Sequence, residues 1–208
     1  MTSPLLACGL SFFIGSIPFG VLIGQMHGVD VRAVGSGNIG ATNVWRALGP
    51  KAGSAAFALD VSKGLAGPLI AAQFAPGHHA VAAACGIAAV FGHTFSPWLG
   101  FKGGKGIATS LGALLGLMPA VGLLTFAAWG LVLAASRTVS TASIAACFVL
   151  PALSVLFREP HSYLLVACLM SGVALIKHIP NMKRLASGTE PKLGQKKPLA
   201  TAGELQVE

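Results

Sequence analysis

The chain has 208 residues, of which 54% are hydrophobic and only 10% are charged. Because a water-soluble domain carries roughly a quarter charged residues, most of the surface of this protein must face lipid. The formal net charge of +8 does not indicate nucleic acid, since the basic residues lie in short loops between apolar runs and in the C-terminal tail. That distribution is typical of membrane topology, so we predict a membrane protein with no nucleic-acid partner.

Apolar runs follow one another along the chain, and we predict that they form seven transmembrane helices of an all-α membrane protein. The expected spans are residues 4–26, 52–75, 80–99, 107–118, 119–135, 141–157 and 162–176. The two central spans separate at Met118-Pro119, because proline disrupts the helix before it. Together the spans make one domain, residues 1–185, and a polar tail, residues 186–208, follows that we expect to be disordered.

Charge decides whether residues 107–135 cross the membrane once or twice. With seven spans, all of the 14 basic residues except Lys63 and Arg158 share the side of the C-terminus. With six spans, that asymmetry disappears. The positive-inside rule therefore predicts seven spans with a short fourth helix, the N-terminus outside and the C-terminus in the cytoplasm, so that the glycine-rich loops described next form a cytoplasmic site.

The segment G-F-K-G-G-K-G, residues 100–106, lies between the third and fourth predicted spans. Glycines let several backbone N–H groups point into one space, and the helix expected to follow adds its positive N-terminal end. We predict that Gly103 and Gly104, together with Lys102 and Lys105, bind a phosphate or carboxylate. The segment is not a Walker A sequence, which would need a glycine at position 99.

The first long loop carries the sequence G-S-G-N-I-G-A-T-N-V-W-R, residues 35–46. Its G-x-G-x-x-G pattern is not a dinucleotide fingerprint, since no strand precedes it and no βαβ unit follows. We predict a glycine turn and a short helix with an amide, a hydroxyl and a guanidinium on one face. The candidate binding residues of this loop are Ser36, Gly37, Asn38, Thr42, Asn43 and Arg46.

Further polar residues occur on or near the same predicted side of the membrane. Asp60 and Lys63 lie one helical turn apart in the second span, where they either pair with each other or let Lys63 contact a substrate. His93, near the cytoplasmic end of the third span, is either a packing residue or a ligand contact. The remaining candidates are Arg137, Ser140, His178 and Asn181. Four segments with glycine turns, cations, hydroxyls or amides are thus predicted on the same face of the membrane. Together they predict a site for an anionic ligand.

The chain lacks G-x-S-x-G and H-E-x-x-H motifs, a carboxylate pair in a loop, and a C-x-x-C pair among its 4 cysteines. Covalent catalysis and metal-dependent phosphoryl transfer are therefore poorly provided for, and we predict no metal and no cofactor. A reaction that needs only alignment of substrates and stabilisation of charge fits this composition. The alternative is a membrane transporter of phosphorylated small molecules, because glycine breaks and cations could line an anion pathway.

Several motifs occur in order between residues 35 and 190: G-S-G-N-I-G-A-T-N-V-W-R, D-V-S-K-G, G-H-T-F-S-P-W-L-G-F-K-G-G-K-G-I-A-T, R-T-V-S and K-H-x-x-N-M-x-R-L-x-x-G-T-E. In these motifs the chain resembles the PlsY family of bacterial membrane acyltransferases. The resemblance implies a multi-pass protein of the bacterial cell inner membrane, in contact with membrane lipids. It also implies transfer of a fatty acyl group from acyl phosphate to the 1-hydroxyl of sn-glycerol 3-phosphate, which gives lysophosphatidate and phosphate in phospholipid biosynthesis.

The same resemblance implies roles for individual residues. It implies that Ser36, Thr42, Gly103, Gly104 and Lys105 hold the acyl phosphate, and that Arg46, Ser140, His178 and Asn181 hold or orient glycerol 3-phosphate. With the candidates already named, the predicted catalytic residues are Lys105, Ser36, His178 and Asn181, and the predicted substrate-binding residues are Gly37, Asn38, Thr42, Asn43, Arg46, Lys63, His93, Lys102, Gly103, Gly104, Arg137 and Ser140. Lys105 would neutralise the departing phosphate, and the proton of the attacking hydroxyl would pass to a substrate phosphate or to His178. Ile179 departs from the family pattern, in which an arginine is expected after the histidine.

Overall fold

The structure is a computed structural model that describes residues 3–194, and all regular secondary structure in this part of the chain is helical. The elements are α1 (Pro4–Ser16), α2 (Phe19–Met26), α3 (Ala41–Leu48), α4 (Pro50–Phe74), α5 (His79–Thr94), the short 3-10 helix η1 (Pro97–Leu99), α6 (Ile107–Leu117), α7 (Pro119–Ser136), α8 (Val139–Leu156), α9 (His161–Lys177) and α10 (Ile179–Ala186). The predicted all-α class is confirmed.

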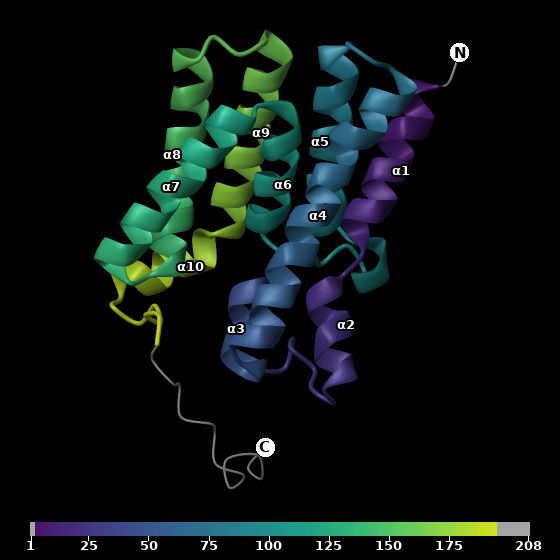
Figure 1. Cartoon of the computed structure of the whole chain (residues 1–208). Helices are drawn as coiled ribbons and strands as arrows, with labels where there is room; N and C mark the ends of the chain where they lie inside the picture. The colour runs from purple at the N-terminus through teal and green to yellow at the C-terminus, as the bar shows by residue number, and fades with distance from the viewer. Residues whose placement is uncertain (1–2, 195–208) are drawn as a thin grey trace, which may run out of the picture.

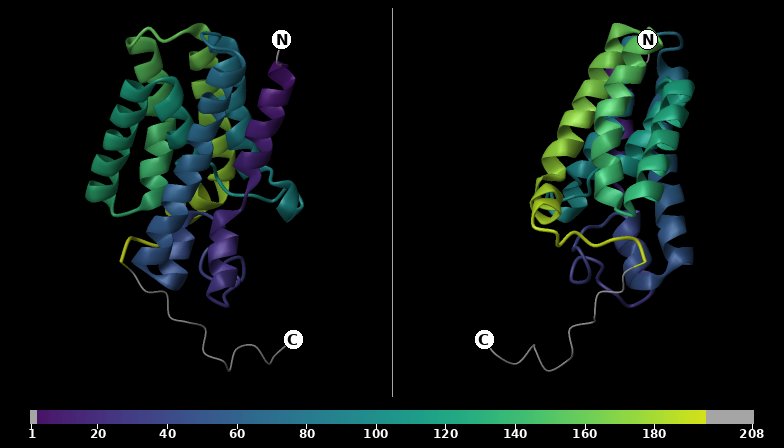
Figure 2. Two further views of the ribbon diagram at one scale, coloured as in Figure 1. Left: turned by 45° about the vertical axis from the view of Figure 1, so that its right-hand side comes forward. Right: turned by 90° about the vertical axis from the view of Figure 1, so that its left-hand side faces the viewer.

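The helices are arranged as a bundle with a smaller layer at one end. Helices α1 and α4 to α9 run side by side, whereas α2, α3 and α10 lie at the lower end of the view (Figure 1). The start of α1 lies at the upper end and the segment 187–194 at the lower end, which the rotated views also show (Figure 2). The polar loops predicted to form the site therefore gather at one end of the bundle.

Prolines set several of the helix boundaries. Helix α1 ends at Ser16, and α2 begins directly after Pro18. Helix α7 begins at Pro119, in the first turn, where the missing N–H of proline has no helical partner to lose. The predicted break at Met118-Pro119 is confirmed, and it leaves α6 with only 11 residues.

Glycine lets several helices approach until their backbones touch. A Cβ atom at Gly15 of α1 would overlap the backbone of Ala89 in α5. A Cβ atom at Gly112 of α6 would overlap the carbonyl oxygen of Val61 in α4. Such close approach is typical of helix packing in lipid, where small residues take the place of a hydrophobic driving force. These contacts hold α1 against α5 and α6 against α4.

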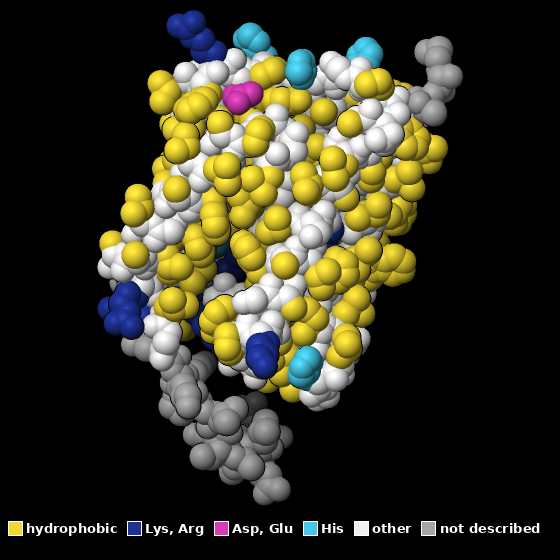
Figure 3. All heavy atoms as spheres, viewed as in Figure 1, with side chains coloured by type: hydrophobic (Ala, Val, Ile, Leu, Met, Phe, Trp, Pro, Cys, Tyr) yellow, Lys and Arg dark blue, Asp and Glu magenta, His cyan; other side chains and the backbone are white. Residues whose placement is uncertain are grey.

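The outer surface of the bundle is apolar. Large side chains such as Leu5, Leu131 and Leu156 are exposed, and apolar atoms cover the middle of the molecule while basic and histidine side chains appear at its two ends (Figure 3). Within residues 3–194, five helices are long and apolar enough to cross a membrane, or six if the pair α9 and α10, bent by 54°, counts as one. The membrane class is thereby supported, whereas the predicted count of seven spans stays a prediction.

The start of the predicted tail differs from the expectation of disorder. Helix α10 runs to Ala186, and the segment 187–194 folds back against the end of the bundle. The backbone N–H of Leu193 donates to the carbonyl oxygen of Arg137 over 2.6 Å. Polar composition alone does not exclude such ordering when the neighbouring surface offers hydrogen-bond partners. The rest of the predicted tail, residues 195–208, lies outside the described residues.

We expect Gly112→Ala to lower the stability of the purified protein in detergent by about 1–3 kcal/mol, because the new methyl group must push α6 away from α4. Thermal unfolding measures the effect. The matched control is Gly172→Ala in α9, where a Cβ atom meets nothing within 4 Å. Equal unfolding temperatures for the two variants would contradict the close α4–α6 contact.

Candidate active site

A polar pocket of about 170 Å³ lies where the first loop, the glycine–lysine loop and the bend between α9 and α10 meet. Its lining residues are Ser36, Gly37, Asn38, Lys105, Lys177, Pro180, Asn181 and Arg184. Three of the four predicted catalytic residues, Ser36, Lys105 and Asn181, therefore come together from segments far apart in the chain. Gly37 and Asn38 are the predicted binding residues that line the same pocket.

The first loop is held in shape by the side chain of Asn43. This buried amide accepts a hydrogen bond from the backbone N–H of Ser36 over 2.8 Å. It also donates to the carbonyl oxygens of Val31 and Val34, over 2.7 and 3.1 Å. Asn43 was predicted to bind substrate, but these bonds occupy its amide and keep it away from the pocket lining. In the structure, the Asn43 side chain therefore positions the backbone of Ser36.

The glycine–lysine loop lies directly against the end of α5. The N–H of Gly103 donates to the carbonyl oxygen of Thr94 over 3.2 Å, and the N–H of Gly104 donates to that of His93 over 3.1 Å. A Cβ atom at either glycine would overlap His93. We predicted that these N–H groups would point at an anion, whereas in the structure they hydrogen-bond to α5 and hold the loop against that helix. The pocket receives the next side chain, that of Lys105.

The ammonium group of Lys105 donates to the Oδ1 atom of Asn181 over 2.5 Å. Burial lowers the pKa of Lys105 from its ordinary value of 10.5 to about 8. The negative charge of Glu190 acts in the opposite direction, and the positive charges of Arg184 and Arg46 lower the pKa further. Lys105 is thus a cation drawn out of water beside other cations, which is the arrangement expected of a receptor for an anion.

His178 is buried next to this contact. Its Nδ1 lies 2.7 Å from the carbonyl oxygen of Ala174, and because a carbonyl can only accept, Nδ1 must carry the proton. Burial, with the nearby charge of Lys105, lowers the pKa of His178 to about 4. The ring is therefore neutral at pH 7 and presents Nε2 as an acceptor, which makes His178 a weak base.

Asp60 and Lys63 of α4 form a separate cluster with His93, whose carbonyl oxygen accepts from Gly104 of the glycine–lysine loop. The Lys63 ammonium lies 2.7 Å from Oδ1 of Asp60 and also donates to the carbonyl oxygen of Ile17, at the break between α1 and α2. His93 Nδ1 lies 3.7 Å from the same carboxylate oxygen. Lys63 and His93, both predicted as possible substrate contacts, do not line the pocket. The geometry favours the alternative of structural pairing.

The other predicted binding residues lie around the pocket rather than in it. Arg46 donates from Nη2 to the carbonyl oxygen of Pro191 over 3.3 Å, and Thr42 lies on the same short helix, α3. Lys102 and Arg137 are exposed and absent from the pocket lining. The buried hydroxyl of Ser140 lies beside the Glu190 carboxylate, where it helps to lower the pKa of that carboxyl.

Sequence reasoning missed Arg184 and Glu190 as site residues. Arg184 lines the pocket one turn after Asn181 on α10. Glu190 accepts hydrogen bonds from Asn181 and Arg184 over 2.6 and 2.7 Å. Both occur in the motif K-H-x-x-N-M-x-R-L-x-x-G-T-E, so that pattern held the available signal. Apart from that motif, nothing in the sequence predicted that Glu190, an acidic residue of the polar tail, would lie near Lys105.

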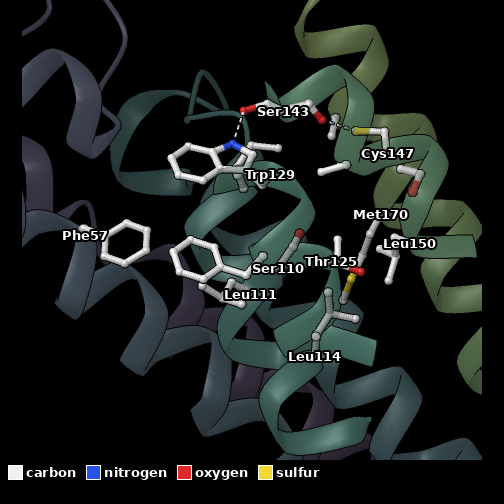
Figure 4. Close-up of a pocket in the computed structure, with 16 residues that line it drawn as sticks. Phe57, Ser110, Leu111, Leu114, Thr125, Trp129, Ser143, Cys147, Leu150 and Met170 are labelled. Carbon is white, nitrogen blue, oxygen red and sulfur yellow. Dashed lines mark hydrogen bonds between the residues drawn. The ribbon is translucent and has the colours of Figure 1, made fainter. Parts of the chain in front are cut away.

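A second, apolar pocket opens among α6, α7, α8 and α9 (Figure 4). Leu111, Leu114, Leu150 and Met170 contribute to its wall, and Phe57 of α4 lies at one side. Ile107 also lines it, only two residues after Lys105. The start of α6 therefore connects a polar pocket to an apolar one.

A family model described as glycerol-3-phosphate acyltransferase matches residues 5–188. The chain belongs to this family. It is 44% identical to the glycerol-3-phosphate acyltransferase of Desulforamulus reducens, over 90% of this chain and 94% of that protein. The corresponding protein of Brucella canis is also 44% identical, over 89% of this chain and 90% of that protein.

Two crystal structures of glycerol-3-phosphate acyltransferases resemble the fold. A structure of PlsY described as an integral membrane glycerol 3-phosphate acyltransferase, in its glycerol 3-phosphate form, superposes with a TM-score of 0.88 and 39% identity, over 92% of this chain and 96% of that chain. The lysophosphatidic acid form gives a TM-score of 0.86 and 38% identity, over 92% and 95%. Family membership decides between acyltransferase and transporter in favour of the enzyme, and this chain is an acyltransferase of the integral membrane type.

The pH profile of acyl transfer by this glycerol-3-phosphate acyltransferase should fall as the pH rises through about 8. The pKa of Lys105 lies there, and above it the ammonium that attracts an anion is lost. We expect Lys105→Arg to remove this alkaline limb, since a guanidinium stays charged throughout. The measurement is kcat/KM between pH 6 and pH 10, corrected for uncatalysed loss of the donor. An unchanged limb in the arginine variant would show that another group titrates.

Proposed function

We propose that the protein transfers the acyl group of an acyl phosphate to the 1-hydroxyl of sn-glycerol 3-phosphate at the cytoplasmic face of the bacterial inner membrane. Acyl transfer to glycerol 3-phosphate follows from the family, and the donor, the membrane face and the residue roles are the proposed part. The observation that carries the proposal is the contact of Lys105 with Asn181 in a cation-lined pocket. Both substrates are anions, so a cation-lined pocket attracts them. Because acyl phosphate is already activated, the transfer needs no covalent enzyme intermediate.

The two pockets suit the two ends of an acyl phosphate. Lys105 faces the polar pocket, and Ile107 lines the apolar one. A donor whose phosphate contacts Lys105 can therefore extend its chain between α6, α7, α8 and α9, toward membrane lipid. Apolar walls favour a hydrocarbon chain because its transfer from water is favourable by about 0.8 kcal/mol per buried CH₂ group.

The transfer step balances without a metal or cofactor. The 1-hydroxyl oxygen attacks the acyl carbonyl carbon, the bond from that carbon to the phosphate oxygen breaks, and phosphate leaves with the electron pair. The proton of the hydroxyl passes to a phosphate oxygen, because the low pKa of His178 leaves it a weak base. His178 Nε2, Ser36 and Asn181 orient the substrates, and Arg46, Arg184 and Ser140 attract the glycerol phosphate. Lys105 stabilises the charge that develops on the departing phosphate.

Seven crossings remain the proposed topology, with the N-terminus outside and the C-terminus in the cytoplasm. Helix α6 has 11 residues and a length of about 16 Å, which is short for a bilayer core of about 30 Å. We propose that it crosses the membrane together with neighbouring protein that thins the local bilayer. The membrane domain extends to at least residue 194 in this proposal, since 187–194 contact the site.

Purified protein in detergent, given palmitoyl phosphate and radiolabelled glycerol 3-phosphate, should form labelled lysophosphatidate. Palmitoyl-coenzyme A is the matched donor control, because it carries the same chain on a thioester. Product from the thioester alone would refute the proposed donor. The same protein is also tested in proteoliposomes. Label that only accumulates inside them, without new lipid, would refute the enzyme and favour transport.

We expect Lys105→Ala to reduce kcat about 100-fold or more while the protein still folds, because the departing phosphate loses its cation. The matched control, Lys102→Ala, removes an exposed lysine from the same loop and should change the rate by less than about threefold. Steady-state kinetics and thermal unfolding of both variants test this. Wild-type rates in Lys105→Ala would remove that residue from the mechanism.

Ala146→Phe should shift the enzyme toward shorter acyl chains, because Ala146 lines the apolar pocket and a phenyl ring would occupy it. The ratio of kcat/KM for palmitoyl phosphate to that for octanoyl phosphate should fall about tenfold or more. Ala127→Phe, on an exposed position of α7, is the control. An unchanged ratio in Ala146→Phe would place the chain elsewhere.

A further inference from the structure

The segment 187–194, called the strap below, crosses the end of the bundle beside the polar pocket. Its first part returns to α10, where the N–H of Thr189 and that of Glu190 donate to the carbonyl oxygen of Arg184 over 2.8 and 3.2 Å. Farther along, the carbonyl oxygen of Pro191 accepts from Arg46 of α3, and Leu193 is bonded to Arg137 at the end of α7. The strap thus links α10, α3 and α7 through backbone contacts.

These contacts place one carboxylate behind two residues that line the pocket, Asn181 and Arg184. The side chain of Glu190 is only 6% exposed. Its Oε1 accepts from Nδ2 of Asn181 over 2.6 Å, and its Oε2 accepts from Nε of Arg184 over 2.7 Å. Burial acts to raise the pKa of Glu190, but the hydrogen bond from Asn181, the nearby Ser140 hydroxyl and Arg184 outweigh it and lower the pKa below its ordinary value. Glu190 is therefore ionised at neutral pH.

The hydrogen bond to Asn181 has a direct consequence for Lys105. A side-chain amide can rotate by half a turn, which exchanges its donor and its acceptor. The Glu190 carboxylate can only accept, so it holds the NH₂ group of Asn181 on its own side and turns Oδ1 toward the lysine. Without that partner, the NH₂ group could face the Lys105 ammonium, and two donors would then oppose each other.

We infer that Glu190 is a positioning residue for acyl transfer, which fixes the amide of Asn181 and thereby the ammonium of Lys105 from the strap. This inference rests on the proposed function, because it gives Lys105 a role at the departing phosphate. It assigns the strap a task in the site that its polar composition does not suggest. Glu190 itself need not touch either substrate.

The charge of Glu190 gives this role a measurable signature. The ionisable groups that face Lys105 from the packed elements are Glu190 of the strap, Arg184 of α10, Arg46 of α3, His178 at the bend and Lys177 at the end of α9. Glu190 raises the pKa of Lys105, and Arg184 and Arg46 lower it. Loss of the carboxylate leaves Lys105 among cations, so the pKa of Lys105 must fall.

Two variants separate the orienting hydrogen bond from the charge. Glu190→Gln keeps an acceptor for Asn181 and removes the charge, whereas Glu190→Ala removes both. Glu159→Gln is the matched control, since Glu159 lies in the turn between α8 and α9, away from the strap. We expect the alkaline limb of kcat/KM to move to lower pH by about one unit in both Glu190 variants. In Glu190→Ala, kcat should also fall about 10- to 100-fold, without a matching rise in KM for glycerol 3-phosphate.

A second measurement does not depend on turnover. The pH dependence of Lys105 modification by an amine-reactive reagent, read by mass spectrometry on the full chain in detergent, reports the pKa of Lys105 directly. We expect its midpoint to lie lower in Glu190→Gln than in the wild type and in Glu159→Gln. A residue away from Lys105, such as Glu159, should leave that midpoint unchanged.

Equal midpoints and equal alkaline limbs in wild type and Glu190→Gln would overturn the inference, as would a wild-type kcat in Glu190→Ala. If Glu190→Ala fails to fold, the Glu190→Gln midpoint still decides. A wild-type protein that forms no lysophosphatidate from palmitoyl phosphate and glycerol 3-phosphate would refute the proposed function instead. The lysine midpoints would then still report whether Glu190 controls Lys105.

Discussion

The site depends on how closely the glycine–lysine loop lies against the end of α5. Gly103 and Gly104 bond to the carbonyl oxygens of Thr94 and His93, at positions where any side chain would overlap α5. That contact determines where the next residue, Lys105, can reach, and it brings its ammonium to the amide of Asn181. A larger residue in the loop would lift Lys105 away from α10 and open the pocket between them.

Next to this loop, a pair of charged side chains stabilises the fold. Asp60 and Lys63 pair within α4, and Lys63 also donates to the carbonyl oxygen of Ile17 at the break between α1 and α2. Unpaired charges in a bilayer are costly, so the pair and its backbone partner reduce that cost and tie three helices together. The cations that remain for anionic substrates stand at the end of the bundle, where water can deliver those substrates.

A short α6 serves the proposed chemistry because it joins two kinds of environment. Lys105 precedes the helix and lines the polar pocket, and Ile107 in its first turn lines the apolar one. A substrate with an anionic end and a hydrocarbon chain needs these surfaces within a few ångströms of each other. Lys105 and Ile107 are two residues apart in the chain, so each pocket has a lining residue at the start of α6.

The sequence by itself determined the all-helical membrane class, the break at Met118-Pro119 and the segments that meet at the site, because hydropathy, proline and charge act locally along the chain. It did not determine the task of each polar residue. Asn43 was expected at the substrate, and Lys63 and His93 were predicted either to contact it or to have a structural role. In the structure Asn43 bonds to backbone, and Lys63 and His93 lie against Asp60. Glu190 was expected in a disordered tail, yet it bonds to Asn181. Only the tertiary structure could decide these cases, since a hydrogen bond depends on which groups from distant segments come within about 3 Å.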